Sequence, residues 1–135
     1  MAKALGLHIL ADLYGVDADK IDRVEDIREL LEGAVKYADL TKISSHYYQF
    51  QPHGATGVVL LAESHISIHT WPEHGVATVD VYTCGDSSKT YKAMDYIINT
   101  LQPSRIDKQV YDRGLIGESE SERETEKLRS ILLKV

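Results

Sequence analysis

Two kinds of hydrophobic spacing divide this chain into helical and extended segments. Apolar residues recur every three or four positions over residues 17–38 and 87–101, which predicts two amphipathic helices, the second with Ser87 or Ser88 as its N-cap. Strands are predicted where β-branched, aromatic and apolar residues alternate with polar ones or form short runs, at residues 5–13, 41–50, 57–61, 64–71, 76–84 and 104–113.

This order of elements predicts an α+β fold with one domain over residues 1–135. We expect a two-layer sandwich, in which both main helices cover one face of an antiparallel sheet. The other face carries His69, Trp71 and Tyr82, so we expect it to be a functional face or to meet a partner subunit. The charged segment from about residue 115 is predicted to be mobile, and Leu128, Ile131 and Leu132 could dock as a short helix.

Composition narrows the function classes. The chain has 135 residues, of which 43% are hydrophobic, and a net charge of -6, so we expect neither nucleic-acid nor anionic-membrane binding. No apolar run approaches the roughly 18 residues of a membrane span, and none resembles a secretory signal. The single cysteine, Cys84, excludes an intrachain disulfide and fits a reducing compartment. We therefore expect a cytoplasmic protein.

Unusual chemistry gathers in the stretch AESHISIHTW, residues 62–71, where Glu63, Ser64 and two histidines interrupt a predicted strand. His65 and His69 are four residues apart, which on a strand is roughly 13 Å, too far for one shared metal ion. The sequence contains neither a HExxH motif nor a CxxC pair. We therefore expect no metal site.

The polar residues leave several roles open. Ser64 is a possible nucleophile with His65 or His69 as its base, but no GxSxG motif surrounds it and no orienting acid is identifiable. Cys84 fits an acid, a nucleophile or a small buried side chain. Glu73 fits either a solvated turn residue or a hydrogen-bond partner for a sugar or an amine. Two large rings lie near turns, those of Phe50 and Trp71, and they fit either core packing or a stacking platform.

Longer motifs resemble a known family. The segment GATG at residues 54–57, followed by VVLLAESHISIHTWPEHG and then by ATVDVYTCGD, closely resembles the small prokaryotic S-adenosylmethionine decarboxylase proenzymes. The likeness extends from LGLHILADLYG near residue 5 to about residue 114.

The resemblance implies that the chain cleaves its own Glu63–Ser64 bond. Ser64 would attack the carbonyl of Glu63 in an N-to-O acyl shift, and β-elimination with loss of ammonia would leave a pyruvoyl group at residue 64. The products would be a β chain of residues 1–63 and an α chain of residues 64–135. The pyruvoyl group would form a Schiff base with the substrate amine and accept electrons during decarboxylation, without pyridoxal phosphate or a metal.

The resemblance also implies roles for single residues. His69 would be the processing residue that assists ester breakdown, supported by the hydroxyl of Thr56, and Cys84 would donate a proton to the decarboxylated carbon. The adenine of S-adenosylmethionine would stack on Phe50 and Trp71. Its ribose would bind the carboxylate of Glu73.

The family resemblance further implies a homodimer with active sites at its interface. Two sheets would pack face to face in a four-layer αββα arrangement, and the product would serve spermidine biosynthesis. Alternation along residues 64–71 puts Ser64 and His69 on opposite faces of an ideal strand. Either a bend at residues 62–65 or a partner subunit must therefore bring them together.

Two other functions remain open at this point. Relatives that keep the pyruvoyl chemistry but act on arginine or ornithine suggest one, and a non-catalytic dimeric binding module is the other. The sequence also departs from the family pattern at Leu7, commonly basic, at Val16, commonly cysteine, and at Thr56, often serine. Retention of Phe50, Trp71 and the Pro72–Glu73 pair favours the adenosyl substrate.

Overall fold

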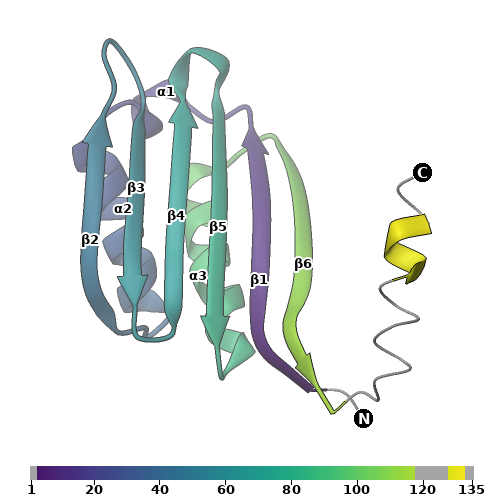
Figure 1. The fold of residues 1–135 in the computed structure, drawn as a ribbon. Coiled ribbons are helices and arrows are strands. Elements are labelled where there is room, and N and C mark those ends of the chain that lie inside the picture. Colours follow the sequence, from purple (N-terminus) through teal and green to yellow (C-terminus); the bar gives the residue numbers. More distant parts are fainter. Residues whose placement is uncertain (1–2, 118–127, 133–135) are drawn as a thin grey trace.

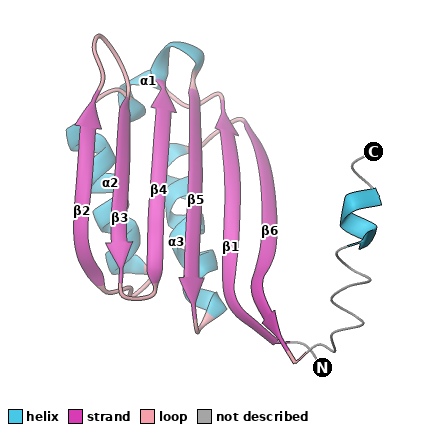
Figure 2. Ribbon diagram, viewed as in Figure 1, coloured by secondary structure: helices cyan, strands magenta, loops and turns pink. Residues whose placement is uncertain are grey.

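The computed structural model, which describes residues 3–117 and 128–132, contains one six-stranded antiparallel sheet with its helices on one face (Figure 1). The strand order is β2-β3-β4-β5-β1-β6. The elements are β1 (Lys3–Tyr14), α1 (Ala18–Ile21), α2 (Val24–Tyr37), β2 (Lys42–Gln49), β3 (Ala55–Leu61), β4 (Ser64–Trp71), the 3-10 turn η1 (Pro72–His74), β5 (Val76–Cys84), α3 (Ser87–Leu101) and β6 (Arg105–Ile116). Figure 2 shows the two layers, and the predicted α+β sandwich is confirmed.

The core lies between the sheet and the helices. Along β4, Ile66 and Ile68 are fully buried on the helix side, whereas the side chains between them project from the opposite, open face. Burying each such side chain contributes about 1.5–3 kcal/mol. The helices contribute a matching apolar stripe, formed by Ile27, Leu30, Leu31, Met94, Ile97 and Leu101. The packed helix layer therefore leaves the other sheet face free to carry polar side chains.

Two helix boundaries differ from the sequence prediction. The helix predicted over residues 17–38 is interrupted, because Arg23 has an extended backbone and α2 begins only at Val24. The Val24 amide donates a hydrogen bond of 2.6 Å to the Gln49 side chain, so a distant strand caps this helix. In α3 the N-cap is Asp86, whose carboxylate accepts a bond from the Ser88 amide; the predicted cap at Ser87 or Ser88 is wrong by one or two residues.

The last strand is longer than predicted. β6 continues to Ile116 because it pairs with β1 as far as Lys3. The predicted mobile charged tail falls largely on residues 118–127 and 133–135, which lie outside the described residues. Residues 128–132 are helical, but their apolar side chains are exposed, so the expected docking of this group is not observed. No described helix has the length and hydrophobicity needed to cross a membrane.

Candidate functional site

The peptide bond between Glu63 and Ser64 lies in the tight turn that joins β3 to β4. Ser64 has a backbone φ of 149°, in a region that favours glycine and costs other residues about 1–3 kcal/mol. The carbonyl oxygen of Glu63 accepts a 2.9 Å hydrogen bond from the Cys84 amide. The Glu63–Ser64 peptide bond is therefore strained at Ser64, and its carbonyl is polarised by the Cys84 amide.

The Glu63 side chain fastens the same turn to the start of β2. Its Oε1 accepts a 3.1 Å hydrogen bond from the Thr41 amide, and the Ala62 amide donates to the Thr41 carbonyl at 2.8 Å. Burial opposes ionisation of the Glu63 carboxyl, but hydrogen bonds from Thr41 and the positive charge of the nearby Lys89 outweigh burial and lower the pKa of this carboxyl. The turn is thus held by an ionised carboxylate at neutral pH.

Cys84 lies at the same end of the sheet as Ser64. It ends β5, directly after Thr83, which pairs with Ser64 across the ladder. Its thiol is free and exposed, so of the predicted roles the small buried side chain is wrong. A surface hollow of about 230 Å³ at this end is lined by residues that include Leu7 and Gly85. The backbone of Cys84 therefore lies next to the strained turn, and its thiol is accessible at the same end of the sheet.

The remaining predicted residues form a second group, at the other end of β4. A pocket of about 290 Å³ is lined by Phe50, His53, Thr56, His69, Thr70, Trp71 and Glu73. Within it, the Thr56 hydroxyl and His69 Nδ1 are 2.9 Å apart, which is hydrogen-bonding distance. The structure thus brings together all three predicted substrate-binding residues and both predicted processing residues.

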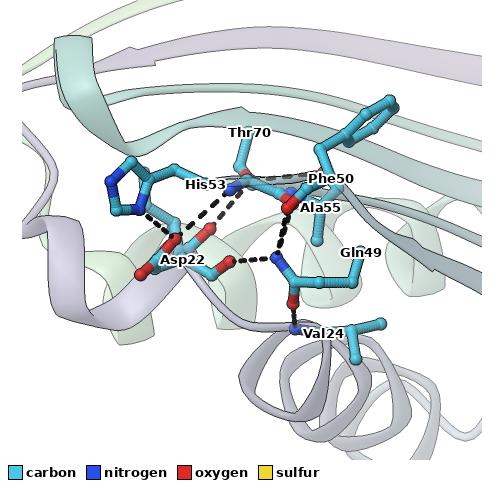
Figure 3. Close-up of polar contacts among 9 residues, drawn as sticks. Asp22, Val24, Gln49, Phe50, His53, Ala55 and Thr70 are labelled. Atoms are coloured by element: carbon cyan, nitrogen blue, oxygen red, sulfur yellow. Dashed lines mark hydrogen bonds and ion pairs between the residues drawn. The ribbon is translucent and has the colours of Figure 1, made fainter.

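A polar network supports the turn that carries Phe50 (Figure 3). Gln49 Nε2 donates to the carbonyls of Asp22 and Gly54 at 2.9 and 2.8 Å, and Asp22 Oδ1 lies 3.1 Å from His53 Nδ1. The Phe50 ring points away from this network and is half exposed. Sequence reasoning missed Asp22 and Gln49, because their contacts join segments about thirty residues apart.

The buried hydroxyl of Thr70 fixes the opposite wall of the pocket. It donates to the carbonyl of Ile21 at 2.8 Å and accepts from the Ala55 amide, also at 2.8 Å. The strand that carries His69 and Trp71 is therefore tied both to α1 and to the start of β3. The segments that carry Phe50 and Trp71 are therefore both held in place by hydrogen bonds.

The two groups do not meet within one chain. Ser64 and His69 are separated by five residues of extended strand, about 17 Å. The chain turns at residues 62–63, within the range where a bend was expected, but β4 then runs extended from Ser64, so this turn does not bring His69 within reach of Ser64. In Figure 1, β4 runs the length of the sheet; Ser64 begins this strand, and His69 and Trp71 lie at its far end. Within one chain, the two groups of candidate residues are therefore separate.

A third polar cluster lies on the open face. His8, His65 and Asp80 are the group of potential metal ligands found among the residues described, with their ligand atoms within 4.8 Å of one another. His8 has no evident partner in the sequence because β1 and β5 are about seventy residues apart. Local sequence patterns therefore do not predict this cluster.

Comparison with known proteins identifies the class of protein to which this fold belongs. The sequence model of the S-adenosylmethionine decarboxylase family matches residues 7–114. The chain belongs to the S-adenosylmethionine decarboxylase family, and the resemblance inferred from its motifs is confirmed.

Individual relatives are very similar. The S-adenosylmethionine decarboxylase proenzyme of Aquifex aeolicus is 84% identical over the whole of both chains. That of Hydrogenobaculum is 74% identical over 88% of this chain and 89% of its own. The crystal structure of the adenosylmethionine decarboxylase from Aquifex aeolicus has a TM-score of 0.84 and 85% identity, covering 87% of this chain and 98% of that one.

Proposed function

We propose that this chain is the proenzyme of a pyruvoyl-dependent S-adenosylmethionine decarboxylase, which cleaves its own Glu63–Ser64 bond. The observation that carries the proposal is the geometry of that bond. Ser64 has a strained backbone, and the Glu63 carbonyl accepts a hydrogen bond from the Cys84 amide. Its near relatives are named as proenzymes, which supports the same interpretation.

Cleavage begins with attack of the Ser64 hydroxyl on the carbonyl carbon of Glu63. The Cys84 amide is placed to stabilise the negative charge that develops on the carbonyl oxygen, and release of the strain at Ser64 favours the step. The carbon–nitrogen bond breaks to give an ester. Loss of the Ser64 α-proton then expels residues 1–63 as a carboxylate, and water displaces the nitrogen as ammonia.

The residue left at position 64 is a pyruvoyl group, which supplies an electron sink for decarboxylation of an α-amino acid. Ser64 fits as its precursor because it already lies at the strained turn whose preceding carbonyl, that of Glu63, accepts a hydrogen bond from the Cys84 amide. Cys84 can deliver a proton to the substrate carbon once carbon dioxide has left. Both residues of this half-site come from the same end of the sheet.

The pocket at the other end supplies the substrate-binding half. Phe50 and Trp71 offer half-exposed rings for an adenine, and aromatic faces also attract a sulfonium cation. Glu73 offers a carboxylate for ribose hydroxyls. A homodimer that packs two open sheet faces together in four αββα layers joins this pocket of one chain to Ser64 of the other. The substrate we propose is therefore S-adenosylmethionine, and the product the aminopropyl donor of spermidine synthesis.

Mass spectrometry and substrate assays test this function separately. The purified 15.1 kDa chain should convert to fragments of residues 1–63 and 64–135, whereas the Ser64→Ala variant should stay intact. Carbon dioxide release should occur with S-adenosylmethionine and not with arginine or ornithine. Release from a free amino acid alone would overturn the substrate, and an intact wild-type chain would overturn self-cleavage and favour a non-catalytic module.

A further inference from the structure

The polar cluster on the open sheet face, formed by His8, His65 and Asp80, contacts the strand that begins at the proposed cleavage site. We propose that Asp80 holds the start of β4 in place once the Glu63–Ser64 bond has been cut, which makes Asp80 a positioning residue for decarboxylation. This inference rests on the self-cleavage proposed above. It assigns a role to contacts that join four strands and take no part in the cleavage chemistry.

Asp80 contacts both side chains that β4 directs to the open face immediately after the cut. The Ser67 hydroxyl donates to Asp80 Oδ1 at 2.7 Å, and His65 Nε2 lies 3.4 Å from the same oxygen. Ser67 is also the ladder partner of Asp80. One carboxylate therefore holds the first and third residues beyond Ser64.

The second oxygen of Asp80 connects the cluster to the far side of the sheet. His8 Nε2 lies 3.2 Å from Asp80 Oδ2, and Arg113 Nη1 lies 2.8 Å from His8 Nδ1. A guanidinium can only donate, so His8 Nδ1 must accept, and the single ring proton is on Nε2 facing Asp80. Asp80 is thus oriented from β1 and, through His8, from β6.

The same tautomer explains why the geometry favours hydrogen bonding over metal binding. An ion bound at His8 Nε2 would require the ring proton to move to Nδ1, where it would face the Arg113 donor. The ligand atoms of His8, His65 and Asp80 lie close enough together to hold a metal ion. The contact with Arg113, however, keeps the ring proton of His8 on Nε2, where it bonds to Asp80.

Cutting the chain creates the need for such an anchor. In the intact chain, the turn at residues 62–63 ties β4 covalently to β3. After cleavage, residue 64 is a chain end without an amide, and chain ends fray unless side chains hold them. The side chains of His8 and Asp80 are only 13% and 23% exposed, so their hydrogen bonds are partly shielded from water. The Asp80 contacts therefore matter most in the cleaved form.

Comparing Asp80→Asn in cleaved and uncleaved protein tests this role. In the cleaved enzyme, we expect kcat to fall about tenfold with little change in KM, because residue 64 is misplaced. Amide hydrogen exchange at residues 65–67 should become faster. In the uncleavable Ser64→Ala chain, the same substitution should leave that exchange nearly unchanged. Asp95→Asn is the matched control, since Asp95 is an exposed carboxylate on α3, away from the open sheet face, and makes no ion pair or side-chain hydrogen bond within the described residues.

Two results would overturn the inference. One is equal acceleration of exchange in both backgrounds, which would show an ordinary structural contact, and the other is an unchanged kcat. Ser67→Ala, which removes one hydroxyl donor to Asp80, should reproduce the effect on a smaller scale if Asp80→Asn fails to fold. Wild-type protein that never cleaves would instead overturn the proposed function, and with it the premise of this role.

Discussion

Ser64 and His69 lie on the same strand, yet they face different surroundings about 17 Å apart. Ser64, at the start of β4, pairs with the buried Thr83 of β5. His69 contacts Thr56 in a pocket at the other end of β4. A general base must lie within about 2.6–3.2 Å of its target or act through one water. Under the proposed mechanism, His69 must therefore act on Ser64 of a second copy.

Mixing two inactive variants tests this arrangement. Ser64→Ala and His69→Ala chains should each remain uncleaved when expressed alone. When the two are co-expressed, a mixed dimer contains one intact pair, Ser64 of the His69→Ala chain and His69 of the Ser64→Ala chain. Mass spectrometry should then show fragments of the His69→Ala chain alone. Its continued integrity in mixed dimers would contradict the shared site.

The sequence predicts the elements of this fold well because their signals are local. The alternation of Ile66 and Ile68 with polar neighbours predicts both β4 and the face that it buries. The break at Arg23 was missed because its cause, a hydrogen bond from Val24 to the side chain of Gln49, depends on a strand that follows much later.

The candidate site was predictable as a set of residues but not as an arrangement. Motif resemblance indicated Ser64, His69 and Cys84, and periodicity alone showed the conflict between the first two. The pairing of β1 with β5 creates the contact between His8 and Asp80, and no local pattern reports such a pairing. Long-range register is the part of the structure that the sequence does not reveal by itself.

Replacing Cys84 should separate cleavage from turnover. Cys84→Ala keeps the backbone amide that bonds to the Glu63 carbonyl, so cleavage should proceed. Decarboxylation should fall by at least about 100-fold, the usual contribution of a positioned proton donor. Fragment analysis and steady-state carbon dioxide release measure the two effects. Because the chain has one cysteine, thiol labelling of wild-type protein should cause a parallel loss. Unchanged turnover would remove Cys84 from the proton-donor role.

The hydroxyl of Thr56 should matter for cleavage through His69. Thr56→Val keeps the shape of the side chain but removes the 2.9 Å contact with His69 Nδ1, so cleavage should slow by about tenfold or more. Thr56→Ser is the matched control, because it retains the hydroxyl and should cleave at a rate close to wild type. Time courses of fragment formation distinguish them. Equal rates for both variants would show that the contact is not used.

Gln49 should control substrate affinity at a distance. Gln49→Leu removes the bonds to Val24, Asp22 and Gly54, which should loosen the turn carrying Phe50. We expect KM for S-adenosylmethionine to rise about fivefold to tenfold, with cleavage intact, as the stacking ring loses its fixed position. The control is Gln51→Leu, an exposed neighbour without a side-chain hydrogen bond in the described part of the chain. A similar KM for the two variants would argue against this support role.

The Glu63 carboxylate should give the uncleaved chain a pH-dependent increment of stability. Its pKa is lowered from an ordinary value of 4.5, since hydrogen bonds from Thr41 and the charge of Lys89 outweigh the opposing effect of burial. The unfolded chain then binds protons more tightly, so the stabilisation is present above that ordinary value and disappears as pH falls through the lowered folded value.

Thermal unfolding in the Ser64→Ala background measures this increment without interference from cleavage. Adding Glu63→Gln should lower Tm slightly at neutral pH, and the difference should vanish in acid. The effect should be small because Glu63 is only partly buried and its contact with the Thr41 amide is exposed to solvent. Val58→Ala, which changes no titratable group, should shift Tm by the same amount at every pH. A Tm difference for Glu63→Gln that grows on acidification would reverse the sign and contradict the Thr41 contact as its cause.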